Sequence, residues 1–236
     1  MVAGGATAAT VSVPFVGCES EGQADPLEAP SGKSKDVSLS ASTARRLAWY
    51  KAELGFGVLA PRGWHCLGVY GSGGGGLYVS AEPIDRENFF SVNWKGSAGP
   101  VVYLGESDGE SSGGFDVARV AARVFPAYWA LAKEVRDAFD LPANEFPFGP
   151  FSTEKLHYKG RDTVEYLTPA NTGGLGTHYE LLRANSRPIR GVAMLLGEPP
   201  SLLLLSVRLP PELASLSSAI IQQTEREASV RASEKH

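Results

Sequence analysis

The sequence has little sulfur and little imidazole, because its 236 residues include two cysteines, two methionines and four histidines. This small set excludes a multi-cysteine disulfide scaffold and leaves few side chains that could hold a zinc ion. Long apolar runs are also missing. Residues 191–196 and 202–205 are far shorter than the roughly 20 residues that a membrane-spanning helix needs. We therefore expect no membrane span.

A positive net charge is absent as well, since 22 Lys and Arg residues face 26 Asp and Glu residues, a formal net charge of −4. Proteins that bind nucleic acid usually show the opposite balance, so we expect no nucleic-acid partner. The composition, 43% hydrophobic and 20% charged, is that of an ordinary globular protein. The length fits one large domain or two small ones.

The two cysteines, Cys18 and Cys66, each lie in a β-like segment. A bond between them would close a long loop and stabilise the fold by about 4 kcal/mol in the loop-entropy model. The alternative is a pair of buried thiols in a cytosolic protein. The N-terminus favours the bond, because residues 1–10 are small and Ala6-Thr7-Ala8 is similar to a signal-peptide cleavage site.

Residues 1–10 lack the charged region and the apolar region of a complete signal peptide. We interpret them as the remnant of a signal or as a disordered segment. The prediction that follows is an exported protein, periplasmic or extracellular, in a compartment where disulfide bonds persist.

Apolar residues at helical spacing predict three main helices, at about 42–54, 115–139 and 211–226. Pro126 interrupts the second helix, but its apolar stripe resumes in phase, which predicts one kinked helix. The third helix begins at a proline pair, and we expect the charged residues 227–236 to form a frayed tail.

Short β-like segments fill the intervals between these helices. Residues 202–205 are apolar at four successive positions, which requires burial of both faces of that strand. The order of elements predicts a single α+β domain over residues 11–226, with a mainly antiparallel sheet and helices on both faces. The predicted strands are residues 58–60, 64–70, 77–80, 89–95, 101–104, 162–168, 177–183, 192–196 and 201–209.

Residues 105–109, Gly-Glu-Ser-Asp-Gly, match the Gly-x-Ser-x-Gly pattern of a nucleophile elbow between a predicted strand and a helix. Ser107, Asp162 and His178 occur in the chain order Ser, Asp, His of a catalytic triad, in which the imidazole would take the proton of the seryl hydroxyl. Three features oppose this reading. The helix pattern begins only after residues 110–114, which would leave Ser107 in a loose loop. Parallel strand–helix alternation is missing, and the acidic neighbours of Ser107 would oppose an oxyanion. A small serine hydrolase is therefore the alternative function.

Residues 71–76 form a glycine run, but it lies between two β-like segments and no Gly-Lys-Ser/Thr follows it. We interpret the run as a hairpin tip rather than a phosphate loop. His178 and Glu180 would share one face of a strand, yet two ligands are too few for a metal. We expect no metal site and no cofactor.

Aromatic side chains are concentrated between residues 56 and 103. Rings in strands usually pack in a core, and the alternative is a binding face. Trp64 shares a strand face with Cys66, which favours burial around a bridge. Trp94 is the better candidate for an exposed platform that stacks on a sugar or a peptide. Both tryptophans are candidate ligand contacts.

Three segments, VPFVGC at 13–18, GVLAPRGWHC at 57–66 and LLLSVRLP at 203–210, together resemble a family of uncharacterised exported bacterial proteins. The resemblance runs from about Val11 to the C-terminal helix. It implies export and a Cys18–Cys66 disulfide, and it brings no activity. The sequence thus predicts an exported, non-catalytic domain that contacts an envelope glycan or another protein, and it indicates neither the ligand nor the oligomeric state.

Overall fold

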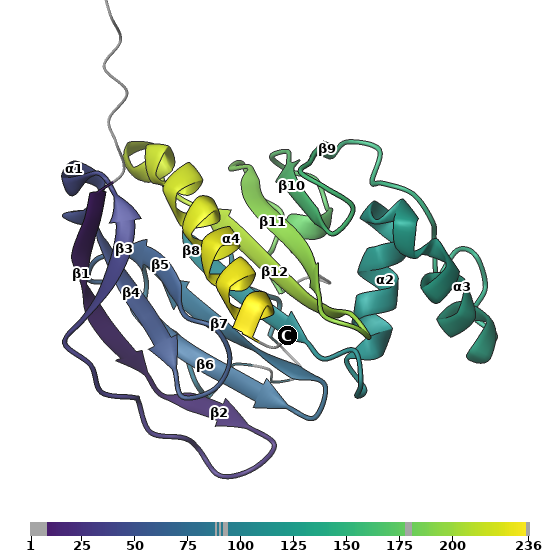
Figure 1. Cartoon of the computed structure of the whole chain (residues 1–236), viewed down its shortest axis with the longest axis horizontal. Coiled ribbons are helices and arrows are strands. Elements are labelled where there is room, and N and C mark those ends of the chain that lie inside the picture. Colours follow the sequence, from purple (N-terminus) through teal and green to yellow (C-terminus); the bar gives the residue numbers. More distant parts are fainter. Residues whose placement is uncertain (1–8, 88, 90, 92–93, 178–180, 235–236) are drawn as a thin grey trace, which may run out of the picture.

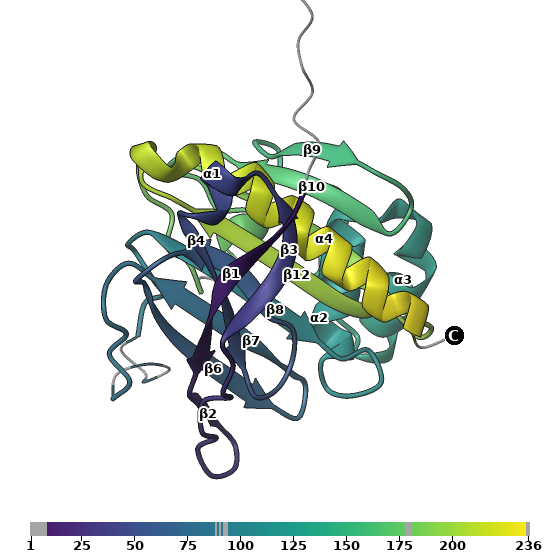
Figure 2. The same cartoon turned by 60° about the vertical axis from the view of Figure 1, so that its left-hand side comes forward.

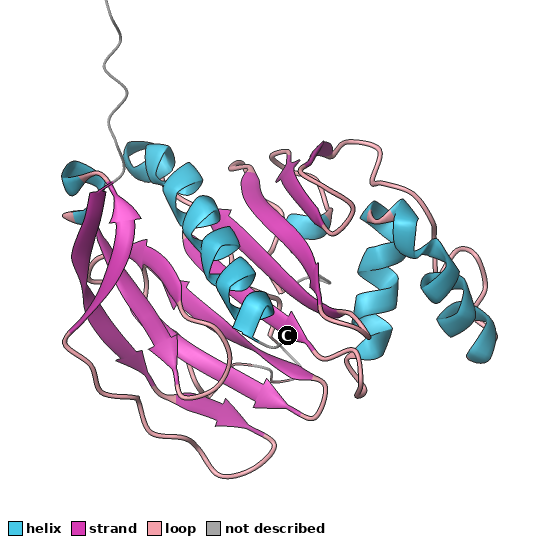
Figure 3. Cartoon of the chain, viewed as in Figure 1, coloured by secondary structure: helices cyan, strands magenta, loops and turns pink. Residues whose placement is uncertain are grey.

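The computed structural model describes residues 9–87, 89, 91, 94–177 and 181–234. This part of the chain forms an α+β fold with two mixed β-sheets and four α-helices (Figures 1 and 3). The small sheet has the order β3-β1-β4-β5, with β1 (Ala9–Cys18), β3 (Ser34–Leu39), β4 (Leu47–Ala52) and β5 (Val58–Pro61). The large sheet has the order β2-β6-β7-β8-β12-β11-β10-β9, with β2 (Ser20–Gly22), β6 (His65–Gly71), β7 (Gly74–Ser80), β8 (Val101–Ser107), β9 (Lys155–Tyr158), β10 (Thr163–Thr168), β11 (Ile189–Leu196) and β12 (Ser201–Arg208).

The helices cover both faces of the large sheet, as predicted. One face packs against the small sheet and α4, which crosses the molecule between the sheets in Figure 2. The other face packs against α2 and its neighbours. The helices are α1 (Ala41–Ala44), α2 (Gly114–Val124), α3 (Trp129–Ala138) and α4 (Ser217–Glu234), with 3-10 turns at Pro126–Tyr128, Leu175–Thr177 and Pro211–Leu216.

The predicted burial of residues 202–205 on both strand faces is confirmed. Leu203 and Leu205 lie in the core that the large sheet shares with the small sheet and α4. Leu202 and Leu204 point the other way, into the core beneath α2. All four side chains are buried, so β12 is an interior strand with an apolar layer on each side.

The predicted helix at 42–54 is wrong over most of its length. Ser40 caps α1 by accepting a hydrogen bond from the Thr43 backbone N–H at 3.2 Å, but α1 ends at Ala44. Residues 47–52 form β4 instead, paired with β1 on one side and β5 on the other. Trp49 and Tyr50 point to opposite faces of β4 and both are buried. The burial of both faces of residues 47–52 favours a strand, although their apolar residues recur at helical spacing.

The predicted kinked helix at 115–139 is two helices, α2 and α3, separated by a 3-10 turn. Phe125 leaves the helical region with φ −122° and ψ 80°. The ring of Pro126 disfavours helical geometry in the residue before it, so α2 ends there. Phe125 is fully buried, which fixes this break in the core.

The third predicted helix is confirmed as a 3-10 turn followed by α4. The prediction of a frayed tail at 227–236 is wrong for residues 227–234, which continue α4. Ala228 is buried against the core, and Glu227 forms an ion pair with Lys35 at 3.2 Å. These contacts with the small sheet hold the charged end of α4 in helical form. Residues 235 and 236 lie outside the described residues.

Most of the predicted strands are confirmed, including the β11–β12 hairpin. The sheets are not purely antiparallel, because β1 pairs in parallel with β4 and β2 with β6. The strand predicted at 89–95 is wrong for its described residues, since Phe89 lies in a turn, Ser91 in a bend and residues 94–95 in irregular structure. The strand predicted at 177–183 is also wrong where it is described, since Thr177 ends a 3-10 turn and Leu182 forms only an isolated bridge to Ser97.

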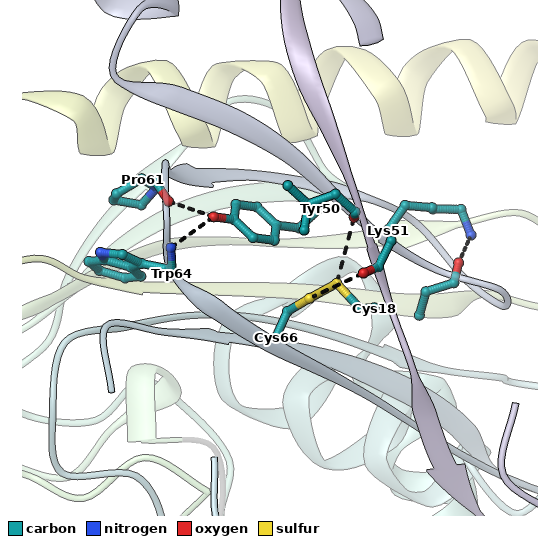
Figure 4. Close-up of a disulfide and its surroundings, with 9 residues drawn as sticks. Cys18, Tyr50, Lys51, Pro61, Trp64 and Cys66 are labelled. Atoms are coloured by element: carbon teal, nitrogen blue, oxygen red, sulfur yellow. Dashed lines mark hydrogen bonds between the residues drawn. A yellow bond between two sulfur atoms is a disulfide. The ribbon is translucent and has the colours of Figure 1, made fainter. Parts of the chain in front are cut away.

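The Cys18–Cys66 disulfide is present, with an S–S distance of 2.04 Å and a Cα–Cα distance of 5.5 Å (Figure 4). Cys18 ends β1 in the small sheet and Cys66 lies in β6 of the large sheet, so the bond joins the two sheets. Tyr50 adds a polar link beside it, donating to the Pro61 carbonyl at 2.8 Å and accepting from the Trp64 N–H at 3.1 Å.

Replacing both cysteines with serine is expected to lower the free energy of unfolding by about 4 kcal/mol, because the unfolded chain loses a long cross-link. Urea unfolding followed by circular dichroism measures this change. Reduction of the wild-type protein should give a similar loss. An unchanged unfolding midpoint in the double variant would show that the bond contributes nothing to stability.

Candidate functional site

A cleft of about 640 Å³ opens at one end of the joint between the two sheets, and we call it the intersheet cleft. Its walls come from the β4–β5 turn, the β6–β7 hairpin, the end of β8, the β11–β12 turn and the last turns of α4. Its volume falls within the range of about 300–1,000 Å³ that is typical of small-ligand sites.

Glycines form the floor of the cleft, at residues 74–76 of β7. The predicted hairpin tip is confirmed for residues 72–73, whereas Gly71 ends β6 and residues 74–76 begin β7. Gly74 has φ +138°, and a Cβ atom there would lie 2.0 Å from the Glu106 carbonyl oxygen, so only glycine fits. Gly75 lies directly opposite Glu106 in the β7–β8 register and so shares the face of the cleft, whereas the Cβ position at Gly76 points to the Tyr103 ring on the other face of the sheet. The missing side chain at Gly75 leaves the backbone of this stretch open to the cleft.

A charged pair stands on the wall of the cleft. One carboxylate oxygen of Glu106 accepts a hydrogen bond from the Phe56 backbone N–H, and the other lies 3.9 Å from the Arg231 guanidinium. The guanidinium carbon of Arg231 lies 4.3 Å from the centre of the Phe56 ring. Arg231 therefore joins α4 to β8 through the Glu106 carboxylate and to the β4–β5 turn through the Phe56 ring. The Glu106 side chain keeps 26% of its surface exposed, so ligand hydroxyls can reach it.

The β4–β5 turn that carries Phe56 is held by Lys51. Its ammonium donates to the carbonyl oxygens of Ala52 at 2.6 Å, Glu53 at 3.2 Å and Leu54 at 3.3 Å. Burial lowers the pKa of Lys51, while the nearby Glu106 carboxylate acts to raise it. Figure 4 shows Lys51 near the disulfide, so the turn and the covalent link between the sheets are neighbours.

Ser20 supplies a buried polar atom to the cleft. It lies two residues after Cys18, lines the cleft and is 3% exposed. Its hydroxyl has no hydrogen-bond partner among the described residues. A buried hydroxyl of this kind is costly unless it is paired, so it favours a ligand with a polar group at this point.

The structure places Ser107 at the end of β8, opposite Gly74 and Leu202, where it is 8% exposed and lines the cleft. Ser107 is thus a strand residue, and α2 begins only at Gly114. A nucleophile elbow needs a tight strand-to-helix turn, which this geometry does not form.

The proposed partners of Ser107 lie elsewhere. Asp162 accepts from the Leu195 N–H, which places it three strand spacings, or about 14 Å, from β8. His157 on β9 is four spacings away, about 19 Å, and His65 lies at the far end of the strands. His178 and Glu180 lie outside the described residues. The structure therefore does not bring Ser107 together with Asp162 or with a described imidazole.

The two predicted tryptophan contacts are both half-buried. Trp94 packs against Phe89 and Tyr78, with ring centroids 4.7 and 6.3 Å apart, in a cluster on the face of the large sheet away from the small sheet. Trp64 packs against the core that contains the disulfide. The rings that line the intersheet cleft are those of Phe56 and Tyr70.

Sequence reasoning missed the residues that shape the cleft. Glu106 was read only as an acidic neighbour of Ser107, and Arg231 fell in the expected tail. Their contact joins β8 to the end of the chain, and no local pattern indicates it.

No group of three or more His, Cys, Asp or Glu residues within the described parts of the chain could hold a metal ion. Among the described helices, none is long and apolar enough to cross a membrane.

Comparisons with protein-family models, with curated proteins and with solved structures found no match. The resemblance to exported bacterial proteins therefore stays a prediction.

Incubation with a fluorophosphonate probe is expected to leave Ser107 unmodified, because the structure places no base within hydrogen-bond reach in its described part. The test compares probe labelling of the wild-type protein and Ser107→Ala by mass spectrometry. Labelling that disappears in Ser107→Ala would reinstate the hydrolase alternative.

Proposed function

We propose that this chain is an exported, non-catalytic domain of the bacterial cell envelope that binds a glycan in the intersheet cleft. The observation that carries the proposal is the open backbone at Gly75 on the floor of the cleft, directly opposite Glu106 and beside the Glu106–Arg231 pair. A sugar ring has a flat C–H face and hydroxyls at its edge, and the cleft offers a surface for each.

The polar groups of the cleft match the edge of a sugar. The Glu106 carboxylate accepts hydrogen bonds from hydroxyls, and the Arg231 guanidinium donates to ring and hydroxyl oxygens. The buried Ser20 hydroxyl can donate or accept. Phe56 and Tyr70 supply rings on which C–H groups can pack.

Export is supported by the disulfide, because such bonds persist in the periplasm and outside the cell and are rare in reducing compartments. The envelope location rests on this bond and on the predicted signal remnant. Among the described residues, neither an imidazole nor Asp162 lies near Ser107 to support hydrolysis. Ligand binding is therefore the function that the geometry supports best.

Glu106→Gln is expected to weaken glycan binding at least about tenfold, because a hydrogen bond to a charged group contributes roughly 1.5–3 kcal/mol. The glutamine oxygen can still accept from the Phe56 N–H, so the fold should persist. The measurement is isothermal titration with soluble glycan strands released from peptidoglycan by a muramidase.

Glu134→Gln on the exposed surface of α3 is the matched control, since it removes the same charge away from the cleft. The control should bind like the wild-type protein. The proposal fails if the wild-type protein binds no glycan strand, or if Glu106→Gln binds as tightly as the control.

A further inference from the structure

A second recess, of about 260 Å³, lies near the opposite edge of the large sheet, between β9, β10, β11 and α4. We call it the basic groove. The polar side chains that line the basic groove are three basic ones, two neutral hydrogen-bonding groups of α4 and one carboxylate: Lys155, His157, Arg190, Ser218, Gln222 and Glu165.

The strand register brings the three basic side chains to one face. Lys155 on β9 and Arg190 on β11 both lie directly opposite Leu167 of β10. Directly opposed residues point to the same face of a sheet, so Lys155 and Arg190 flank Leu167 about 10 Å apart. His157 lies two residues along β9 and shares that face.

Glu165 lines the groove directly opposite His157, and it is engaged by another lysine, as is Glu225 of α4. Lys159 lies 2.5 Å from Glu165 and 2.8 Å from Glu225, so it neutralises part of their charge. The side chains of Lys155, His157 and Arg190 form no ion pair or hydrogen bond with any other described residue. Lys155, Arg190 and Lys159 outnumber the carboxylates Glu165 and Glu225, so the groove keeps a positive balance in a chain of net charge −4.

We propose that the basic groove binds a phosphate monoester. The planar fork of Arg190 matches two phosphate oxygens, and Lys155 supplies a compact charge from the opposite side. Ser218 and Gln222 offer neutral donors on the third side. A recess of this size suits one phosphoryl group, whereas nucleic acid needs an extended basic surface.

Inorganic phosphate is the first probe, measured by isothermal titration on the full chain. The variant Lys155→Gln/Arg190→Gln is compared with Lys33→Gln/Arg45→Gln, which removes the same charge from two exposed sites outside the groove. The wild-type protein and the control pair should bind with a Kd below about 1 mM, and the groove variant at least about tenfold more weakly.

The second probe separates a lipid headgroup from a soluble phosphate. Phosphatidylcholine vesicles with and without phosphatidic acid are sedimented with each protein. Sedimentation that requires phosphatidic acid and is lost only in the groove variant supports a lipid source, and phosphate binding without sedimentation supports a soluble one. Absence of phosphate binding in the wild-type protein, or an equal loss in both double variants, overturns the proposal.

Discussion

The bond between Cys18 and Cys66 fixes the relation of the two sheets on which the rest of the structure depends. The chain passes from the small sheet to the large one directly after Cys18, since β1 ends there and β2 begins at Ser20. A covalent link at this crossing keeps the sheets in contact. The intersheet cleft opens beside it, and Ser20 belongs to its wall. The shape of the cleft therefore depends on the packing of the two sheets that the disulfide links.

Helix α4 completes this arrangement from the other end of the chain. Its buried face covers part of the large sheet, and its charged side contacts the small sheet through Glu227 and Lys35. The same helix lines both recesses, with Ser218 near its start in the basic groove and Arg231 near its end in the cleft. One helix thus contributes side chains to both recesses.

Local sequence patterns correctly predicted the elements whose burial is visible in their own residues. The hairpin of β11 and β12 follows from an uninterrupted apolar run, and α2 follows from its single apolar stripe. Residues 47–52 were misread because burial on two faces comes from strands far away in the sequence. The cleft was missed for the same reason, since Glu106 and Arg231 meet only after the sheets have packed. The disulfide could be predicted from the sequence because two cysteines allow a single pairing.

The central claim is that a covalent bond joins the two sheets in the native protein. The most direct measurement is the intact mass of protein isolated without reductant, before and after treatment with iodoacetamide in denaturant. The account predicts a mass lower than that of the reduced chain by two hydrogen atoms and no alkylation until a reductant is added. Two carbamidomethyl groups on the unreduced protein would contradict it.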